Sequence, residues 1–461
     1  MVCERLSLSV LLGQHFLNPS LFIRHSEIAL AFKDDSRHIA AMRNDGHSSM
    51  HQHLPPGIGV IEFVAMMASM MSMVALQIDP MLPALPEIGR DLQVAHANDR
   101  QLIIVQFFVG LGCGALIFGP LSDRFGRRPV LLLAGLGTLA ATISCALSTS
   151  FEVMLAGRLL GGFFAASARV MIASIVRDCF QGDHMARIMS FVILIFIVVP
   201  VVAPTVGQVI LYFAPWRAIF WMLVVLVGAQ LLWVALRLPE TLEPERRGGI
   251  DPRIVAGSFL KIATHRNAIG HMIASGLMMA GLVGFISTVQ QIFSDTFGRA
   301  ELLGPGFAFI VFWMALGALV NGRLVERYGA RRLSQSAVIG VVTVSLVHLA
   351  VIVFSGENIV TFILAQALVT TCFSFAGANF SAISLEPFSR SAGVASSIQT
   401  TTTTLISAGL GGLAGAMFNG TTIPLTLGFI LFGSLSFLVI AWAENWRLFR
   451  RPGNARLREG F

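Results

Sequence analysis

Charged side chains are scarce in this chain of 461 residues. Asp, Glu, Lys and Arg together make up 12% of it, whereas soluble globular domains carry about 25%. Hydrophobic residues make up 55%, and the mean hydropathy is +0.76. A water-soluble fold cannot cover so much apolar surface, so this composition indicates that the lipid bilayer is the solvent of most of the chain.

Lysine is almost absent, and Lys33 and Lys261 are the only two. Neither follows glycine in a G-x-x-x-x-G-K-[ST] loop, which excludes an ATP-driven pump for this chain alone. The apolar segments also lack an H-E-x-x-H motif and a His/Asp/Glu cluster, which argues against a membrane-embedded enzyme or receptor. We therefore expect no catalytic residue, metal or cofactor, with a proton gradient as the energy source.

Cysteine is also rare. The five cysteines are Cys3, Cys113, Cys145, Cys179 and Cys372, and none belongs to a C-x-x-C pair. Because four of them lie in or beside apolar segments, they are interpreted as small core residues rather than a disulfide framework or a metal site.

Apolar segments of about 20 residues, the length that spans a bilayer as a helix, alternate with short polar breaks from Ile58 onward. They predict twelve transmembrane helices in an all-α polytopic membrane protein. The twelve segments are residues 58–83, 98–121, 129–147, 152–176, 186–211, 217–237, 267–293, 304–324, 333–354, 359–384, 392–417 and 424–444.

The polar stretches divide the chain into two bundles of six helices. The predicted bundles cover residues 57–237 and 267–445, joined by a cytoplasmic linker over residues 238–266. Residues 1–56 contain six of the eleven histidines and no segment of spanning length, so we expect a disordered cytoplasmic extension. A basic cytoplasmic tail is expected over residues 446–461.

The distribution of Arg and Lys over the loops predicts the orientation. Sixteen of these residues lie in one set of loops and four in the other, where the four are Arg90, Arg100, Arg217 and Arg299. This places the first set and both termini in the cytoplasm. The net charge of +7 is therefore interpreted as a topology signal, and no nucleic-acid partner is expected.

A charged loop after the second apolar segment occurs twice in the chain. The first copy is Gly119-Pro-Leu-Ser-Asp-Arg-Phe-Gly-Arg-Arg-Pro129. The second is Gly322-Arg-Leu-Val-Glu-Arg-Tyr-Gly-Ala-Arg-Arg332, 203 positions later. Repetition at half-chain spacing in so apolar a sequence indicates two copies of one membrane bundle.

The residue types of the first copy suggest a gate at the cytoplasmic side. Gly119 and Gly126 permit a close helix approach and a sharp turn. Asp123 can face a cation or a helix N-terminus, while Arg124, Arg127 and Arg128 can bind carboxylates or lipid head groups. A plain positive-inside anchor is the alternative, but an anchor needs neither fixed glycines nor a second copy.

This loop resembles the signature loop of the major facilitator superfamily, in its drug/proton antiporter branch. Asp79-Pro-Met-Leu-Pro-Ala-Leu-Pro, at the end of the first segment, is similar to the bicyclomycin/chloramphenicol-resistance (Bcr/CflA-like) transporters. Arg158-Leu-Leu-Gly-Gly, Pro215-Trp-Arg and Pro239-Glu-Thr-Leu also resemble segments of these proteins. The resemblance implies multidrug efflux, and hence antibiotic resistance, by a monomer in the bacterial inner membrane.

The fifth segment resembles the antiporter motif only in part. Pro200, Pro204 and Gly207 are present and predict a kink in this helix. Val199, Ala203 and Gln208 stand where many relatives have glycine, and this departure weakens the segment as evidence for antiport.

Ionisable side chains inside the apolar segments are functional candidates, because each costs about 2.5–3.5 kcal/mol at the middle of a membrane helix. Asp79, Arg158 and Gln106 occupy similar depths in the predicted outer part of the first bundle. We predict that Asp79 and Arg158 form a proton switch in which protonation of Asp79 releases Arg158. The alternative for Asp79 is a cap or turn residue before Pro80.

Two further charges lie nearer the cytoplasm. Arg169 follows Arg158 by about three helical turns and projects from nearly the same face. We expect it to extend to the cytoplasmic surface, with a place at the inner end of the substrate cavity as the alternative. Glu62 is expected at the interface or paired with an arginine, rather than as a proton carrier.

The second bundle has almost no charge in its apolar segments, and Thr361 stands at the position that corresponds to Arg158. Gln290 and Asn379 are its candidates for the substrate cavity, together with Gln106 and Arg169 of the first bundle. Hydrogen bonding between helices is the alternative for the glutamines and asparagines. This asymmetry favours proton handling in the first bundle and apolar substrate contact in both.

The sequence thus predicts a secondary transporter that exports small, largely apolar compounds in exchange for protons. Two bundles that rock about a site near the middle of the membrane would perform the exchange. A proton-coupled importer of a metabolite or an anion is the alternative, in which Arg158 and Arg169 bind an anionic substrate.

Overall fold

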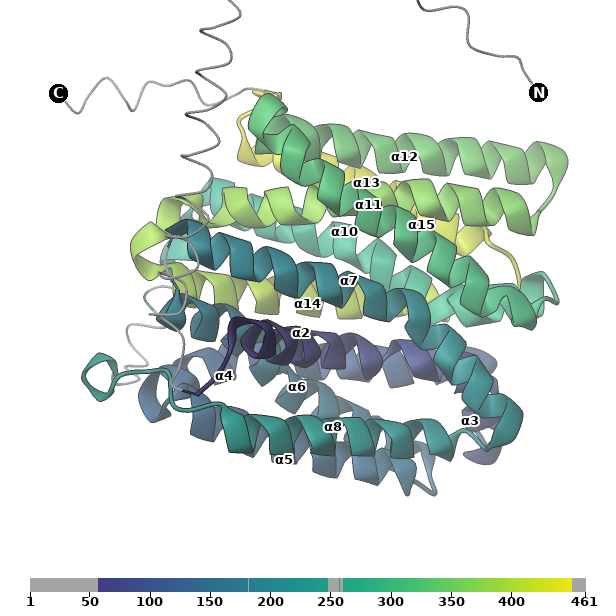
Figure 1. Cartoon of the computed structure of the whole chain (residues 1–461). Coiled ribbons are helices and arrows are strands. Elements are labelled where there is room, and N and C mark those ends of the chain that lie inside the picture. The colour runs from purple at the N-terminus through teal and green to yellow at the C-terminus, as the bar shows by residue number, and fades with distance from the viewer. Residues whose placement is uncertain (1–56, 181, 248–256, 258–259, 450–461) are drawn as a thin grey trace, which may run out of the picture. The chain divides into compact units, whose positions relative to one another are not determined.

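The computed structural model describes residues 57–180, 182–247, 257 and 260–449. These residues form helices, turns and loops without a β-strand, which confirms the all-α fold class. Figure 1 shows the long helices of the first group (purple to teal) and of the second group (green to yellow) running roughly parallel. The predicted extension over residues 1–56 and most of the predicted tail lie outside the described residues.

The first group contains six long helices. They are α2 (Val60–Leu76), α4 (Leu102–Phe125), α5 (Arg127–Ala146), α6 (Phe151–Cys179), α7 (Gly182–Phe213) and α8 (Arg217–Arg237). Helix α6 packs against α4 and α5, α8 packs against α5, and α2 packs against α7 and α6. These six helices lie between residues 60 and 237 of the chain.

The second group also contains six long helices. They are α10 (Arg266–Gln291), α11 (Leu303–Tyr328), α12 (Ala330–Ser355), α13 (Ile359–Leu385), α14 (Ala392–Ala416) and α15 (Ile423–Ala443). Helix α10 packs against α14, α15 and α13, while α12 packs against α13 and α15. The linker residues described between the groups include the short 3₁₀ helix η4 (Pro244–Arg246) and a helical stretch over residues 260–264.

Two helix pairs join the groups. Helix α4 packs along α14, and α7 packs along α11. Glycines allow the first pair to approach closely, since a Cβ atom on Gly112 would lie 2.9 Å from the Leu405 side chain and one on Gly412 would lie 3.0 Å from Val105. Small residues serve this purpose in membrane helices because apolar lipid supplies no hydrophobic driving force between them.

Eleven helical segments in the described part of the chain are long and apolar enough to span a membrane. The twelfth predicted span is α14, which forms a helix of 25 residues but falls outside that set. Its sequence contains the run Thr400–Thr404. Because α14 packs against α10 and α4, its polar positions have protein neighbours as well as lipid.

The first predicted span differs most from the structure. Helix α2 ends at Leu76, and the 3₁₀ helix η2 (Asp79–Ala84) and the short helix α3 (Leu85–Asp91) continue the segment. Pro80, Pro83 and Pro86 interrupt α-helical hydrogen bonding because proline lacks the backbone N–H. Asp79 therefore lies at a break in the first span, as the first residue of η2.

Helix α7 runs through both prolines of the fifth segment and is continuous from Gly182 to Phe213. Gly207 lies against the backbone carbonyl of Pro80, where a Cβ atom would overlap with it. Glycine at this position thus lets α7 pack directly onto η2, and Pro200 of α7 lines the same cavity as Asp79.

Candidate transport cavity and ion-pair loop

A cavity of about 330 Å³ lies between the two groups of helices, within the range of about 300–1,000 Å³ typical of ligand sites. The first group contributes residues of α2, η2, α6 and α7, and the second contributes residues of α10, α11 and α13. The lining side chains of the second group are Met279, Leu282, Phe285, Ile286, Phe307, Ile310, Val311, Met314 and Thr370. Apart from Thr370, this wall is entirely apolar.

Both charged residues that line this cavity come from the first group. Asp79 lies at the start of η2, where it is buried, and Arg169 projects from α6. Within the described part of the chain, neither side chain forms a hydrogen bond or an ion pair. Arg169 is exposed and lines the cavity. The structure therefore places Arg169 on the cavity wall, which is the alternative to the expected position at the cytoplasmic surface.

Arg158 lies elsewhere, in the interface between α6 and α4. Its side chain is buried, its Nε donates a hydrogen bond to the Ile103 carbonyl at 3.1 Å, and its guanidinium lies 4.4 Å from the centre of the Phe107 ring. No ion pair between Arg158 and Asp79 is present among the described residues. The positions of the two residues in their predicted spans indicate similar depths in the membrane. The packing of α6 on α4, however, turns the Arg158 side chain away from the cavity.

The other polar candidates for the cavity are dispersed. Gln106 is half-buried on α4 and does not line the cavity. Asn379 donates a hydrogen bond to the Asn321 side chain at 2.9 Å and so links α13 to α11. Gln290 lines a separate cavity of about 220 Å³ near η6 (Ala300–Leu302). Of the four predicted cavity residues, only Arg169 therefore lines the cavity to which Asp79 belongs.

Glu62 is paired with an arginine, as predicted. Its carboxylate accepts hydrogen bonds from Arg237 Nε at 2.6 Å and Arg237 Nη2 at 2.7 Å. Trp233 Nε1 lies 3.4 Å from the same carboxylate. These contacts join α2 to α8 at their ends and leave Glu62 outside the cavity.

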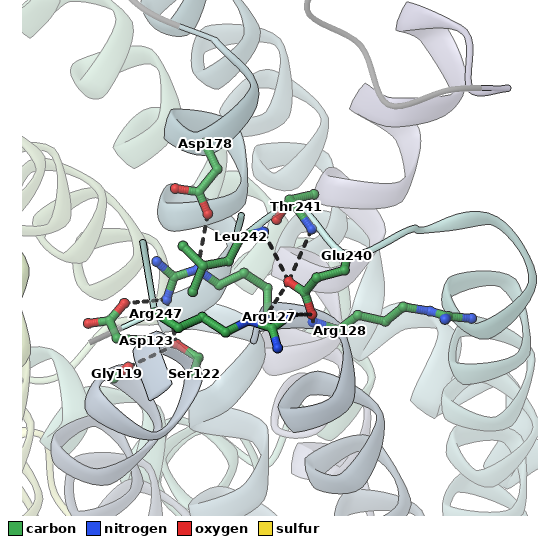
Figure 2. A network of polar contacts seen from close by, with 10 residues as sticks. All are labelled: Gly119, Ser122, Asp123, Arg127, Arg128, Asp178, Glu240, Thr241, Leu242 and Arg247. Carbon is green, nitrogen blue, oxygen red and sulfur yellow. Dashed lines mark hydrogen bonds and ion pairs between the residues drawn. The ribbon is translucent and has the colours of Figure 1, made fainter. Parts of the chain in front are cut away.

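The repeated loop forms a network of ion pairs around Arg127, which Figure 2 shows. Arg127 is buried at the start of α5, where its Nε donates to Asp178 at 3.0 Å and its Nη1 donates to Ser122 at 2.8 Å and to Asp123. Asp178 comes from the end of α6. Arg127 thus ties the α4–α5 turn to a third helix.

Glu240 completes the network from the segment after α8. Its carboxylate accepts hydrogen bonds from the backbone N–H groups of Arg127 at 2.9 Å and Arg128 at 3.3 Å. These groups belong to the first turn of α5, which lacks partners inside the helix and favours negative charge. Pro239-Glu-Thr-Leu resembles a segment of the family, but this resemblance does not predict the contact of Glu240. The signal in the sequence is a carboxylate directly after the sixth span.

Gly126 is required by this arrangement. Its φ is +96° and its ψ is 157°, a region that is accessible almost only to glycine. A Cβ atom there would also overlap with the Glu240 carboxylate. Gly119 instead serves a helix contact, because a Cβ atom on it would lie 2.8 Å from Ser397 Oγ of α14.

The remaining arginines of the loop make local contacts. The Arg128 guanidinium donates to the Ala235 carbonyl at 2.7 Å, and Arg124 lies over the Phe125 ring at 5.2 Å. In the second copy, Arg331 forms ion pairs with Glu444 at 3.0 Å and Glu386 at 3.1 Å. Both copies therefore connect the helix after the loop to a carboxylate beyond the last helix of the same group.

Two groups of transmembrane helices that enclose a largely apolar cavity between them define a polytopic membrane transporter. The chain belongs to the Major Facilitator Superfamily, whose sequence profile matches residues 59–412. It is accordingly an integral membrane transporter and not an enzyme.

Three curated bacterial relatives are similar to this chain. The uncharacterized MFS-type transporter YdgK of Bacillus subtilis (strain 168) is 33% identical over 60% of this chain and 68% of its own length. The bicyclomycin resistance protein homolog of Haemophilus influenzae is 31% identical over 56% of this chain and 65% of its own length. The multidrug resistance protein MdtL of Escherichia coli O81 (strain ED1a) is 28% identical over 48% of this chain and 55% of its own length.

A solved structure supports the fold. The D-xylose-proton symporter superposes with a TM-score of 0.69 over 84% of this chain and 97% of its own, at 13% sequence identity. At this identity the likeness concerns the arrangement of the helices alone.

Proposed function

We propose that this protein exports small, largely apolar compounds across the bacterial inner membrane in exchange for protons. The observation that carries this proposal is the cavity between the helix groups, where a wall of Met, Phe, Leu, Ile and Val faces a single acidic side chain, Asp79. The names of two relatives, a bicyclomycin resistance homolog and a multidrug resistance protein, support export of drugs.

Asp79 is the proposed proton-binding residue. A buried carboxylate is costly in its charged form unless a partner compensates it, and Asp79 has no hydrogen bond among the described residues. With Asp79 ionised, its charge and that of Arg169 sum to zero; with Asp79 protonated, Arg169 leaves the cavity with a net charge of +1. Proton binding thus changes the electrostatic environment of a bound compound.

The geometry changes the proposed role of Arg158. We assign the cation that faces the same cavity as Asp79 to Arg169, and we assign Arg158 to the attachment of α6 to α4. The apolar wall of the second group then provides contact surface for compounds of different shape, because the flexible side chains of Met279 and Met314 adapt to irregular ligands.

Import of an anionic metabolite is the second candidate, and the position of Arg169 on the cavity wall favours it. The two candidates predict opposite directions of substrate movement under the same proton gradient. Uptake driven by an inward proton gradient indicates import, whereas extrusion that a protonophore abolishes indicates export.

The first prediction concerns Asp79→Asn, tested in proteoliposomes with a compound panel that includes bicyclomycin. We expect the variant to elute as a monodisperse protein and to lose proton-driven transport by at least about tenfold, because the amide cannot bind and release a proton. Glu62→Gln, which alters a carboxylate outside the cavity, is the matched control and should retain transport. Undiminished proton-driven transport by Asp79→Asn would refute the role of Asp79.

A further inference from the structure

Side-chain amides of the first helix group hold backbone groups at helix ends of the second group. These contacts gather at the end of the helices that carries the 3₁₀ helix η3 (Ala97–Gln101) and η6. By the charge distribution of the loops, this is the predicted outer end. The contacts come from two places, η3 and α7.

The first contact is made by Asn98 of η3. Its Nδ2 donates hydrogen bonds to the Ala416 carbonyl at 2.9 Å and to the Phe418 carbonyl at 2.8 Å. Helix α14 ends at Ala416, and the last carbonyls of a helix have no partner within it. Asn98 therefore caps the C-terminal end of α14 across the interface.

The second contact is made by Gln208 of α7, one of the residues that stands where many relatives have glycine. Its Nε2 donates to the Ala300 carbonyl at 2.9 Å, and its Oε1 accepts from the Gly304 N–H at 3.2 Å. Helix α11 begins at Leu303, so the Gly304 N–H is one of the unpaired donors of its first turn. Gln208 therefore caps the N-terminal end of α11 across the interface.

A pair of glutamines supports the first contact. Gln291 of α10 donates through Nε2 to Asn98 Oδ1 at 3.0 Å, and Gln101 of η3 donates to Gln291 Oε1. Gly415 of α14 lies directly against Gln101, where a Cβ atom would overlap with its side-chain oxygen. Gln291 of the second group thus orients the Asn98 amide, and Gln101 of the first group orients the Gln291 amide.

We propose that Asn98 and Gln208 form a latch that holds the two helix groups together at the predicted outer end and opens during each transport cycle. Separation of the groups at this end must break four hydrogen bonds to backbone atoms and leave helix-terminal groups without their caps. The latch rests on the proposed function, because transport by alternating access requires the two groups to separate at the predicted outer end. It does not depend on Asp79 or on the identity of the substrate.

The test measures the distance between one spin label on each helix group by double electron–electron resonance. Spin labels are placed at Ala95→Cys and Glu301→Cys, both at exposed positions, in a background in which the native cysteines are serine. Asn98→Ala and Gln208→Leu are each expected to raise the ratio of separated to closed molecules about thirtyfold, since each removes two hydrogen bonds and a hydrogen bond contributes about 1 kcal/mol. The double variant is expected to show a larger shift than either single variant.

Matched controls remove amides that act within one group. Asn358→Ala removes the cap of α13, where Asn358 Oδ1 accepts from the Val360 N–H at 2.8 Å. Gln230→Leu removes a contact of Gln230 with Ser69 inside the first group. Both controls should leave the distance distribution unchanged. Equal distributions in the control, single and double variants would overturn the proposal.

A second pair of variants keeps the test decisive if Asn98→Ala folds poorly. Asn98→Asp has nearly the same shape but cannot donate to the two carbonyls, so it should open the latch at least as far. Gln208→Glu keeps the shape of Gln208 but cannot donate to the Ala300 carbonyl, so it should also raise the ratio of separated to closed molecules. Unchanged ratios in both of these variants would contradict the latch.

These measurements are made without substrate and without a proton gradient. Loss of the proposed proton coupling at Asp79 therefore leaves the latch prediction intact. Conversely, unchanged distances in a protein that still performs proton-driven export would reject the latch alone.

Discussion

Three arginines within the predicted spans or at their ends have different environments, and these environments indicate different roles. Arg127 is compensated by Asp123 and Asp178 in ion pairs. Arg158 is held by a backbone carbonyl and an aromatic face. Arg169 faces the cavity with Asp79. A charge near the membrane is thus structural where protein groups surround it and is available for function where it borders a cavity.

The second prediction compares Arg158→Gln with Arg169→Gln. Arg158→Gln should lower the free energy of unfolding by about 2 kcal/mol, because it removes a cation–π contact and a charge-assisted hydrogen bond. Arg169→Gln should change stability by only about 0.5 kcal/mol and reduce transport by about tenfold or more. Thermal unfolding in detergent and transport per folded molecule in proteoliposomes provide the two measurements. Normal stability with lost transport in Arg158→Gln would return the coupling role to Arg158.

At the scale of the elements, the structure shows how the start of α5 is positioned. The turn before it depends on Gly126, the helix N-terminus binds Glu240, and Arg127 reaches the end of α6. The second copy repeats the positive φ at Gly329, +85°, and pairs Arg331 with Glu444. Glu240 and Glu444 both follow the last helix of their group, so the duplication includes partners outside the repeated loop.

The third prediction is that Gly126→Ala destabilises the protein by about 2 kcal/mol, because alanine rarely adopts this backbone conformation and its Cβ would displace Glu240. Gly228→Ala is the matched control within α8. Nothing lies within 4 Å of a Cβ atom at that position, so the substitution should stabilise the helix by up to about 1 kcal/mol. Opposite shifts of the unfolding temperature are therefore expected, and equal shifts would contradict this interpretation.

At the scale of the whole molecule, two groups of six helices contact each other through a few helix pairs. Most helix contacts lie within a group, whereas α4 with α14 and α7 with α11 provide the extensive contacts between groups. This arrangement allows the groups to move relative to each other about a cavity between them, as in the alternating access of transporters built from repeats. The latch at Asn98 and Gln208 acts on this motion at one end only.

The fourth prediction concerns the independence of the groups. Co-expression of residues 1–250 with residues 251–461 should yield two fragments that assemble in the membrane, because membrane helices insert individually and associate by packing. Co-purification through an affinity tag on one fragment measures the assembly. Gly412→Leu, which places a large side chain against Val105 where α14 packs on α4, should reduce the yield of the complex. Failure of the unmodified fragments to associate would show that the linker is required.

The sequence by itself determined the class of the protein, the order of twelve helices and the duplicated loop. These features follow from composition and periodicity, since a bilayer requires apolar segments of a given length whose backbone hydrogen bonds are satisfied internally. It also indicated that Asp79 was unusual, because a carboxylate beside Pro80 in an apolar segment is costly. Glu62 was correctly expected to pair with an arginine, although Arg237 itself could not be named.

The tertiary structure decided which of these residues meet. Sequence spacing predicts how deep a side chain lies but not which neighbouring helix it faces. It therefore grouped Asp79 with Arg158, although Arg169 is the arginine that lines the same cavity as Asp79. It could not identify Asp178 or Glu240 as partners of the loop, because these contacts join segments 51 and 113 residues apart. Nor could it show that Gln208, a departure from the family pattern, caps a helix of the other group. Depth in the membrane is a property of one helix, whereas contact depends on how the helices rotate and pack against each other.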